Sequence, residues 1–571
     1  MSHTRALTAV LVSALALLAP AAASAAPGDL DASFSGDGKL TADLGATDTG
    51  EAVLYQPDGK VVVAGQTGSG PLADFAILRF NTDGSPDNSF DTDGRVTIPF
   101  GPRDEAKALA LQPDGSIVVA GNTYADAGPS TGSFSIGVTR IDKDGHIDAA
   151  FNHGSGRKIV DFGGQELAED VLVQPDGKIV VGGQTQVGTN SNFFWARLED
   201  DGDLDNTFDG DGRATLDAGG SENTASIDLG PGGTILTAGS TTANAGGSRD
   251  YTVVRLTTGG VPDNSFSQDG RAQVGFGDAD DVATGISVLP DGSALVGGRS
   301  LELIDGAAAG DFTAARLTPQ GELDPSYGDG GRARIPSDSV EVATDATATP
   351  DGGLAIVGST FKSGAFVDFA AGVLRPDGEP DTRFGGGRPV VVDVSGGADL
   401  GHAVATRDGR VAIAGNSFTD VEVAQLVLPR PGDPFPPEPT PAEQPSAPTE
   451  QPSAPPAEGQ PPAMPAGDTT APIVSNLRLK PTRFRARRGT RGSFALTEPA
   501  RVILTVQRRR GRRFVRAGSV KLSGKPGRNT FKLRKLGRRR LASGSYRLIA
   551  TAVDPAGNAS RKVRVGFRVR R

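Results

Sequence analysis

The sequence has no cysteine, which excludes disulfide bridges, thiol nucleophiles, iron–sulfur clusters and Cys-ligated zinc. Aromatic residues make up only 5% of its 571 residues, and beyond the first 25 residues no apolar run is long enough to span a membrane. Glycine and proline, by contrast, number 79 and 40. This composition argues against helical bundles and favours β structure with many turns.

The net charge of −10 hides two regions of opposite sign. Residues 471–571 contain 30 Lys and Arg but only two acidic residues, Glu498 and Asp554, for a net charge of +28. The first 470 residues have 28 basic and 66 acidic residues, for a net charge of −38. Charges of this size predict two bodies with different surfaces, each able to attract charged partners.

Residues 1–25 have the pattern of a secretory signal peptide. Arg5 precedes an apolar run that ends at Leu18, and small residues lead to a predicted cleavage after Ala25. A buried N-terminal helix is the alternative, which Pro20 disfavours. We therefore expect an exported protein, extracellular or at the cell envelope, without membrane insertion. An exported protein that lacks cysteine fits a bacterium better than an animal secretome.

Three phrases recur seven times, with a period of 56 to 62 residues. The first is a P-D-G turn followed by apolar residues, as in Q-P-D-G-K-V-V-V-A-G from Gln56. The second, L-D-x-S-F-x-x-D-G, is centred on Phe34, Phe90, Phe151, Phe208, Phe266, Tyr327 and Phe384. The third places Arg79, Arg140, Arg197, Arg255 and Arg316 in apolar alternation, with Val373 and Gln425 at the remaining positions. Each copy is expected to be one structural unit of a repeat protein.

Each repeat has the pattern of four short strands, which we call A to D. In the second repeat we expect strands over Ala106–Leu111, Ser116–Ala120, Phe134–Ile141 and Arg157–Phe162. A D-type strand at Lys39–Leu44 precedes the first repeat, and the last repeat ends after a C-type strand at Val421–Leu428. Pairing of these two strands would close a ring and remove its free edges. The sequence thus predicts an all-β fold, with a seven-bladed β-propeller at residues 28–428. A parallel β-helix is the alternative, but its turns are much shorter than this period.

Length varies in one connection of the repeat, between strands B and C. The distance from the turn glycine to the arginine position ranges from 16 residues (Gly409 to Gln425) to 25 (Gly115 to Arg140). In an up-and-down blade the B–C and D–A connections share one face, so we expect ligand specificity there. The recurrent arginines could bind carboxylates. Their equivalent spacing instead predicts structural pairing with Asp between blades.

The L-D-x-S-F-x-x-D-G phrase followed by Q-P-D-G-K-[IV]-V-V-A-G resembles the delta-60 repeat, a bacterial β-propeller family. The resemblance covers about Gly28 to Leu428. It implies a propeller in a secreted or surface protein. It implies no defined activity and no catalytic residues.

Residues 429–472 contain 16 prolines in 44 positions, which predicts an extended linker; a ligand for Pro-recognising domains is the alternative. Residues 473–571 then alternate like strands at Arg501–Gln507, Arg513–Leu522, Asn529–Leu533, Ser545–Val553 and Lys562–Arg570. We expect a small Ig-like β-sandwich here, because L-A-S-G-S-Y ending at Tyr546 resembles a tyrosine corner. The run AVDPAGNAS (Ala552–Ser560) resembles Ig-like modules at the end of bacterial surface proteins.

Arginine clusters in this basic region are candidate polyanion-binding residues, because guanidinium groups pair bidentately with phosphate and carboxylate. They are Arg508, Arg509, Arg510, Arg512, Arg513, Arg538, Arg539 and Arg540. The expected partner is an anionic cell-envelope or extracellular polymer, and the alternatives are the protein's own acidic propeller or a merely solvated surface. Export makes genomic nucleic acid an unexpected partner.

Calcium is the only cofactor for which the sequence offers candidate ligands. They are Asp87, Asp91 and Asp93, repeated as Asp205, Asp209 and Asp211. Asx turns are the preferred account of these aspartates, because the loop lacks the bidentate Glu of a calcium-binding loop. His146 and His153 show no ligand pattern and are expected in a surface turn, and His402 is the remaining histidine of the mature chain.

The sequence shows no nucleophile elbow, P-loop or paired-carboxylate signature, so we assign no catalytic residue. We expect a secreted or cell-surface, non-catalytic binding and adhesion protein. Its propeller would bind a ligand, and its cationic domain would attach it to anionic polymer. A propeller-type glycan hydrolase or lyase is the alternative. A pocket with two carboxyls of perturbed pKa on the variable face would favour that alternative.

Overall fold

The computed structural model describes most of the chain between Ala25 and Arg570. The described residues are 25–124, 133–188, 190–242, 248–277, 280–304, 307–337, 339–361, 367–435, 472–480, 482–485, 490–497, 500–510, 513–533, 535–536, 539–553, 560 and 563–570. The predicted signal peptide (except Ala25) and most of the predicted linker lie outside them. The chain divides into two compact units, Met1–Glu443 and Gln444–Arg571.

The first unit consists of four-stranded antiparallel sheets, numbered here in chain order. Sheet 1 is β2 (Asp48–Tyr55), β3 (Val61–Thr67), β4 (Asp74–Phe80) and β5 (Arg95–Ile98); sheet 2 is β6 (Asp104–Leu111), β7 (Ile117–Tyr124), β8 (Phe134–Ile141) and β9 (Arg157–Val160); sheet 3 is β10 (Glu166–Val173), β11 (Ile179–Val187), β12 (Asn190–Leu198) and β13 (Arg213–Leu216); sheet 4 is β14 (Ser221–Leu229), β15 (Ile235–Thr242), β16 (Arg249–Leu256) and β17 (Arg271–Val274). Sheet 5 is β18 (Asp280–Val288), β19 (Ala294–Ile304), β20 (Ala307–Leu317) and β21 (Arg332–Ile335); sheet 6 is β22 (Val340–Ala348), β23 (Leu354–Phe361), β24 (Val367–Leu374) and β25 (Val390–Val392); sheet 7 is β26 (Leu400–Arg407), β27 (Arg410–Asn416), β28 (Val421–Val427) and β1 (Lys39–Ala42). Two short 3₁₀ turns, Gly70–Leu72 and Pro231–Gly233, complete this unit's regular structure within the described residues.

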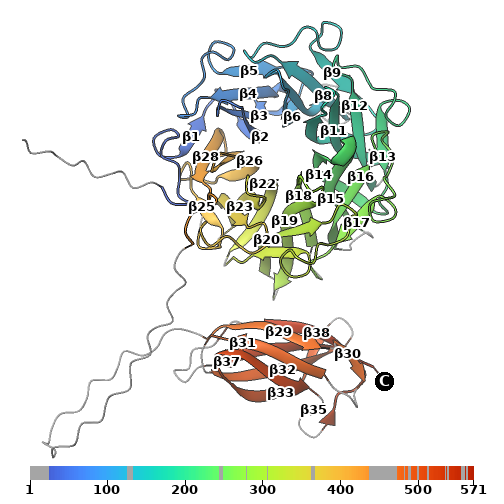
Figure 1. Ribbon diagram of the computed structural model, residues 1–571, viewed down its shortest axis with the longest axis vertical. Helices are drawn as coiled ribbons and strands as arrows, with labels where there is room; N and C mark the ends of the chain where they lie inside the picture. Colours follow the sequence, from blue (N-terminus) through green and yellow to red (C-terminus); the bar gives the residue numbers. More distant parts are fainter. Residues whose placement is uncertain are drawn as a thin grey trace, which may run out of the picture. The chain divides into compact units, whose positions relative to one another are not determined.

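The sheets are arranged in a ring, with their first strands on the inner side (Figure 1). The first strands of consecutive sheets contact one another, and β26 also contacts β2. The last sheet is completed by the first strand of the chain, because β1 pairs antiparallel with β28, Lys39 opposite Ala424. The predicted pairing of these two strands is therefore confirmed. Four-stranded antiparallel sheets repeated around an axis are the architecture of a β-propeller.

The phrase that is centred on an aromatic residue forms the core between sheets. Phe34, Phe90, Phe151, Phe208, Phe266, Tyr327 and Phe384 are all at most 1% exposed. In four of the repeats the arginine eleven residues earlier lies over this ring, for example with the Arg197 guanidinium 4.6 Å from the Phe208 ring centroid. Each copy thus buries one large ring in an equivalent place.

The recurrent arginines also join neighbouring sheets, although not as predicted. The Asp partner of Arg197 is Asp205 of the same sheet, with Nε and Oδ2 2.6 Å apart. The contact with the next sheet is a hydrogen bond from Arg197 Nη1 to the Thr258 carbonyl, 2.6 Å. Arg79, Arg140 and Arg255 repeat both contacts, and Arg140 alone of these also reaches an Asp of the next sheet, Asp200. The prediction of Asp pairing between blades is therefore wrong for most copies, because the carboxylate that lies closest belongs to the aromatic phrase of the same repeat.

Each first strand contains a β-bulge, which puts one extra residue into the inner side of the ring. In β10, for example, Ala168 pairs with Gly183 and Asp170 pairs with Gly182, so Glu169 is left unpaired. The glycine opposite is required, because a Cβ on Gly183 would lie 2.1 Å from the Leu167 carbonyl oxygen. The V-V-A-G type phrase therefore ends in glycine because the bulge places a backbone carbonyl oxygen where the Cβ of any other residue would lie.

The second unit has two sheets around one apolar core. Its strands are β29 (Val474–Lys480), β30 (Arg483–Arg485), β31 (Thr490–Leu496), β32 (Ala500–Arg510), β33 (Arg513–Gly524), β34 (Gly527–Leu533), β35 (Lys535–Leu536), β36 (Arg539–Arg540), β37 (Gly544–Val553) and β38 (Val563–Arg570). The sheet orders are β29-β31-β34 and β30-β38-β37-β32-β33, with β35 and β36 as a separate hairpin. The Tyr546 hydroxyl donates a hydrogen bond to the Ala542 carbonyl, 2.8 Å, which is the contact that a tyrosine corner makes.

Among the described residues, no helix has the length and apolar character needed to cross a membrane.

Candidate functional site

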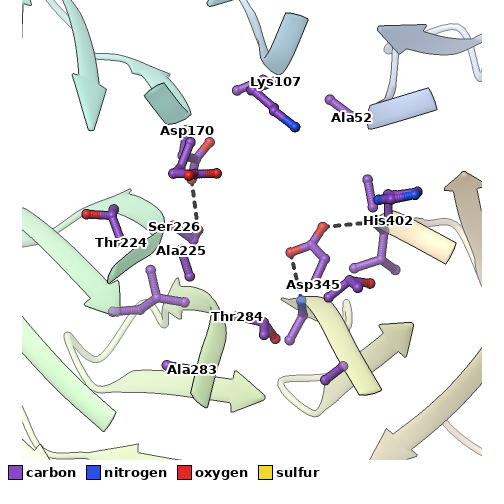
Figure 2. Close-up of a pocket in the computed structure, with 18 of the residues that line it drawn as sticks. Ala52, Lys107, Asp170, Thr224, Ala225, Ser226, Ala283, Thr284, Asp345 and His402 are labelled. Atoms are coloured by element: carbon purple, nitrogen blue, oxygen red, sulfur yellow. Dashed lines mark hydrogen bonds between the residues drawn. The ribbon is translucent and has the colours of Figure 1, made fainter. Parts of the chain in front are cut away.

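A cavity of about 570 Å³ lies on the axis of the ring. Within the described residues, the first strand of each four-stranded sheet contributes to its lining, together with Arg249 of β16 and Arg299 of β19. Figure 2 shows Lys107, Asp170 and Asp345 pointing toward the centre of this opening from different strands. The lining residues include no Phe, Tyr or Trp. The cavity is therefore suited to a polar ligand rather than to an apolar one.

The bulges provide the residues that ring the cavity. The unpaired residue of each first strand lines it: Glu51, Lys107, Glu169, Ala225, Thr284, Thr344 and His402. These seven equivalent positions hold four charged or titratable side chains, two hydroxyls and one methyl group. The repeats thus share their backbone and differ in the chemistry that they present on the axis.

One side of the cavity is a cluster of carboxylates around a lysine. The Lys107 ammonium lies 3.2 Å from Glu51 Oε2 and 2.6 Å from Glu105 Oε1. Burial alone would lower the pKa of Lys107, but the Glu51 and Glu105 carboxylates raise it above its ordinary value. His402 Nδ1 lies 3.6 Å from the same Glu51 oxygen. Lys107 is therefore charged at neutral pH and is held by the acidic residues around it.

Two glutamates of this cluster have pKa values that move in opposite directions. Burial raises the pKa of Glu169 to about 7, although Lys107 acts against the rise. Burial also acts on Glu51, but the nearby Lys107 ammonium and the His402 side chain lower its pKa below the ordinary value. At neutral pH Glu51 is therefore ionised while Glu169 is close to half protonated. A pair of this kind can in principle bind and release a proton.

Two further carboxyls of the cavity connect neighbouring sheets. Asp170 Oδ2 accepts hydrogen bonds from the Ile227 backbone N–H and the Ser226 hydroxyl, both 2.8 Å long. Asp345 Oδ2 accepts one from the Val404 backbone N–H, also 2.8 Å. Burial raises the pKa of Asp170 to about 6 and that of Asp345 to about 7, despite these hydrogen bonds. Both carboxyls therefore already have a structural partner.

Two arginines add positive charge to the cavity from sheets 4 and 5. Arg249 holds Asp280 through two hydrogen bonds, Nη2 to Oδ2 at 2.6 Å and Nε to Oδ1 at 3.0 Å. Arg299 Nη1 donates to the Ala343 carbonyl, 2.6 Å, and burial together with the Arg249 charge lowers its pKa. The Arg299 Nε is buried and has no hydrogen-bond partner in the described structure. The cavity thus contains charges of both signs.

The predicted polyanion-binding arginines fall in two places of the second unit. Arg508, Arg509 and Arg510 end β32, and Arg513 begins β33 opposite Arg510. Arg539 and Arg540 form β36, which pairs with β35, and β35 contacts β33. Arg508 is half-buried and donates from Nη2 to the Ser543 carbonyl, 2.6 Å. Arg512 and Arg538 lie outside the described residues.

The aspartates considered for calcium already have partners. Asp87 Oδ2 lies 2.7 Å from Arg79 Nε and 3.0 Å from Lys60 Nζ, and Asp205 has the equivalent contacts with Arg197 and Lys178. Asp93 and Asp211 face Arg95 and Arg213, while Asp91 and Asp209 have backbone φ angles of 44° and 49°. The Asx turns are confirmed at Asp87, Asp93, Asp205 and Asp211, whose Oδ1 atoms accept the backbone N–H two residues on. Calcium binding at these aspartates stays the untested alternative.

Carboxylates do gather elsewhere in the first unit. Asp43, Asp48 and Asp420 form one group within the described residues, and Asp368, Asp393 and Asp399 form another. The Asp48 and Asp399 side chains in these groups accept backbone N–H hydrogen bonds, from Leu44 and Val394. These aspartates therefore have structural contacts of their own.

Sequence reasoning did not identify the residues that line the axis. Ligand specificity was predicted on the variable B–C connections, and much of the longest of them lies outside the described residues. Glu51, Lys107, Glu169 and His402 belong to no motif, because the axis is lined by single residues about 60 positions apart. One sequence feature could have indicated them. Glu169 and Asp170 are adjacent polar residues in a strand whose apolar and polar residues otherwise alternate, which is the sequence pattern of a β-bulge.

Comparison with known families supports the fold. Residues 56–90, 112–151, 174–208 and 231–266 match the family described as a domain of unknown function (DUF5122) beta-propeller. With the ring of sheets, this match makes the chain a β-propeller repeat protein. A comparison with curated proteins finds no match.

The similar solved structures are distant from this chain in sequence. A catalytically inactive virginiamycin B lyase from Staphylococcus aureus is 15% identical, with a TM-score of 0.41, over 68% of this chain and 99% of that one. A polysaccharide lyase is 12% identical, with a TM-score of 0.38, over 66% and 90%. An α-L-arabinanase from Penicillium chrysogenum is 10% identical, with a TM-score of 0.35, over 56% and 92%. None of these likenesses transfers a substrate or a site residue to this chain.

Proposed function

We propose that this chain is an exported, non-catalytic binding and adhesion protein. In this proposal residues 28–428 are a seven-bladed propeller of delta-60-type repeats that binds a ligand. A Pro-rich linker joins the propeller to a basic, Ig-like domain, which attaches to anionic envelope or matrix polymer. The single observation that carries the ligand-binding role is the mixed-charge cavity on the axis, to which every first strand contributes.

The cavity supports binding of a small polar ligand with hydroxyl, amide or charged groups. Glu51 and Lys107 offer charges of opposite sign, and the Thr344 hydroxyl, which donates to the Gly401 carbonyl, can still accept a hydrogen bond from a ligand. Asp170 and Asp345 accept hydrogen bonds from backbone N–H groups of the next sheet. Their role is therefore to join neighbouring sheets of the ring rather than to take part in a reaction. This use of the carboxyls favours binding over catalysis.

Filling the cavity tests the proposal. Ala225 is a bulge residue on the axis, so Ala225→Phe should occupy the cavity without removing a polar contact. We expect the full chain to bind members of a glycan and peptide array, and Ala225→Phe to lose this binding. Ala150→Phe, at an exposed turn residue, is the matched control and should bind like wild type. Retained binding in Ala225→Phe would show that the axis is not the ligand site.

A glycan hydrolase or lyase is the second candidate, and one observation favours it. The pKa of Glu169 is raised and the pKa of Glu51 is lowered. Two carboxyls whose pKa values are pushed apart in this way are typical of a general acid and a general base. If glycans that bind to the protein are also cleaved, and Glu169→Gln and Glu51→Gln each abolish cleavage while binding persists, the protein is an enzyme. New reducing or unsaturated chain ends are the readout.

A further inference from the structure

One face of the three-stranded sheet of the second unit has five basic residues, and no sequence motif indicated it. Along β29, β31 and β34 the inward residues are apolar and buried, among them Leu479, Phe494 and Leu533. The residues that alternate with them point to the other side of the sheet. These are Arg478, Lys480, Arg491, Ser493, Arg528, Thr530 and Lys532. Ser493 is half-buried and the others are exposed.

The register of this sheet places three cations in one row. Lys480 lies opposite Arg491, and Arg491 lies opposite Lys532. The next row on the same face consists of Arg478, Ser493 and Thr530. Adjacent strands are about 4.8 Å apart, so three cations stand across roughly 10 Å of sheet with two hydroxyls beside them. A hollow of about 830 Å³ lies over this face and is lined by all seven of these residues.

This arrangement costs stability unless something compensates for the charge. Like charges directly opposite one another destabilise a sheet, and here the middle strand has such a neighbour on both sides. The acidic residues of 471–571 are Glu498 and Asp554, and both lie outside the described residues. Within the described residues, the three cations of the row lie opposite one another and not opposite a carboxylate. A row of this kind is stabilised by an anion that lies across the strands.

We infer that this basic sheet face is the binding site for a linear phosphate-bearing polymer. The inference rests on the proposed function, because it gives the attachment of the second unit a location and a ligand chemistry. Lys480, Arg491 and Lys532 contact successive phosphates, and Ser493 and Thr530 donate hydrogen bonds from the neighbouring row.

Phosphate fits this face better than carboxylate does. The unbridged oxygens of a phosphate group point in different directions, so one group accepts from cations on two adjacent strands and from a hydroxyl as well. A carboxylate offers two oxygens in one plane, which suits a single guanidinium. Arg, Lys, Ser and Thr together are also the side chains that contact the phosphates of nucleic acid backbones.

Binding of the full chain to linear inorganic polyphosphate tests the inference. The variant is Lys480→Gln, Arg491→Gln and Lys532→Gln together, which removes three charges from exposed positions. The matched control is Arg485→Gln, Arg568→Gln and Arg570→Gln, which removes three exposed charges from β30 and β38. Affinity is measured at several salt concentrations, and the unfolding of each variant is compared with wild type to confirm that it folds.

The face variant should lose both affinity and salt dependence. Each neutralised phosphate contributes about 0.7–0.9 to the slope of log affinity against log salt, so the slope should fall by about 2 and the affinity at about 0.1 M salt by on the order of 100-fold. The control should weaken binding less than about threefold, because Arg485, Arg568 and Arg570 belong to the other sheet and do not line the hollow, so they act on the polymer only through long-range attraction that salt screens.

The other outcomes separate this inference from the proposed function. Equal losses in the two variants would show that net charge alone binds the polymer, which overturns the site and leaves the attachment intact. Binding of polyglutamate through this face without binding of polyphosphate would overturn the phosphate assignment. If wild type binds neither polyanion, the proposed attachment itself is wrong.

Discussion

Equivalent residues of different repeats can have different acid–base behaviour. Glu51 and Glu169 both occupy the bulge of a first strand, in sheets 1 and 3. Lys107 of the sheet between them ion-pairs with Glu51, which His402 also approaches, so the pKa of Glu51 falls below its ordinary value. Burial dominates at Glu169, and its pKa rises. The neighbour rather than the position in the repeat decides which carboxyl is charged.

The stability of the propeller should therefore fall as pH rises, and Glu169→Gln should weaken this dependence. Below about pH 4.5 the Glu169 carboxyl is protonated in the folded and unfolded chains alike and costs nothing. From there to about pH 7 the folded chain keeps a proton that the unfolded chain has released, so each step in pH lowers the free energy of unfolding. The free energy of unfolding of Glu169→Gln should therefore rise relative to that of wild type, by on the order of 1–3 kcal/mol from pH 5 to pH 8.

Urea unfolding at the two pH values measures this effect. The fluorescence of Trp195 follows the propeller alone, because it is the only tryptophan of the chain and is fully buried in β12. Glu379→Gln, at an exposed position, is the control. Its free energy of unfolding should differ from that of wild type by the same amount at both pH values. A Glu169→Gln profile parallel to that of wild type would contradict the raised pKa.

A missing side chain can be replaced from a nearby position of the same sheet. Sheet 6 has Val373 where other repeats have the recurrent arginine. There Arg383 approaches Asp381 at 2.7 Å and donates from Nη1 to the Arg430 carbonyl, 3.1 Å. The ion pair with the aspartate of the aromatic phrase is thus retained although the arginine comes from a different part of the repeat.

At the scale of elements, alternation in the sequence predicted the strands well. The second repeat was expected to have strands at Phe134–Ile141 and Arg157–Phe162, and β8 and β9 are Phe134–Ile141 and Arg157–Val160. In the second unit β29 and β31 were not assigned, although residues 474–480 and 490–496 contribute to the apolar core. Hydrophobic period 2 identifies a strand, but register depends on partners far away in sequence. The basic row of Lys480, Arg491 and Lys532 exists only after that register is known.

The bulges, like the register, depend on the pairing of two strands, the first strand of each sheet and its neighbour. Their glycines were visible in the sequence as the end of the V-V-A-G type phrase, but a glycine in a strand has several explanations. The structure selects one, a carbonyl that approaches from the bulge. The cavity residues could therefore be predicted from the sequence only if the position of each bulge were known.

Gly183→Ala should destabilise the propeller and disturb the cavity. The added Cβ would lie 2.1 Å from the Leu167 carbonyl oxygen and 2.6 Å from the Phe194 ring, so the backbone must move. Overpacking of this kind costs about 1–3 kcal/mol. Unfolding followed by Trp195 measures the loss. Gly259→Ala, where the nearest atom is 3.8 Å away, is the control and should be close to neutral. Equal stability of the two variants would mean that the bulge does not need its glycine.

For the whole molecule, closure of the ring depends on a strand of four residues. Removal of residues before Asp48 would delete β1 and the buried Phe34, and would leave the outer edge of β28 without a partner. Unpaired edges favour association with other chains. Compared with a chain that begins at Ala25, the shorter chain should unfold at lower urea concentration and form oligomers. Light scattering after size exclusion checks this. A stable monomer would show that β1 is dispensable for closure.

The opposite charges of the two units can act on each other as well as on outside partners. The first 470 residues carry −38 and the rest +28, and the linker keeps the effective concentration of one for the other high. A protease site in place of residues 450–455 allows the chain to be cut after folding. We expect the two halves to elute together at about 0.02 M salt and separately at about 0.5 M, because the Debye length falls from over 20 Å to roughly 4 Å.

Polyphosphate should release the halves even at low salt, if it competes for the basic face of β29, β31 and β34. The variant with Lys480→Gln, Arg491→Gln and Lys532→Gln should separate at lower salt than wild type for the same reason. Halves that separate at about 0.02 M salt without competitor would contradict an attraction between the units. In that case the +28 of the second unit acts on an outside polymer alone. If they remain together, an outside polymer must compete with the acidic first unit for the same basic charges.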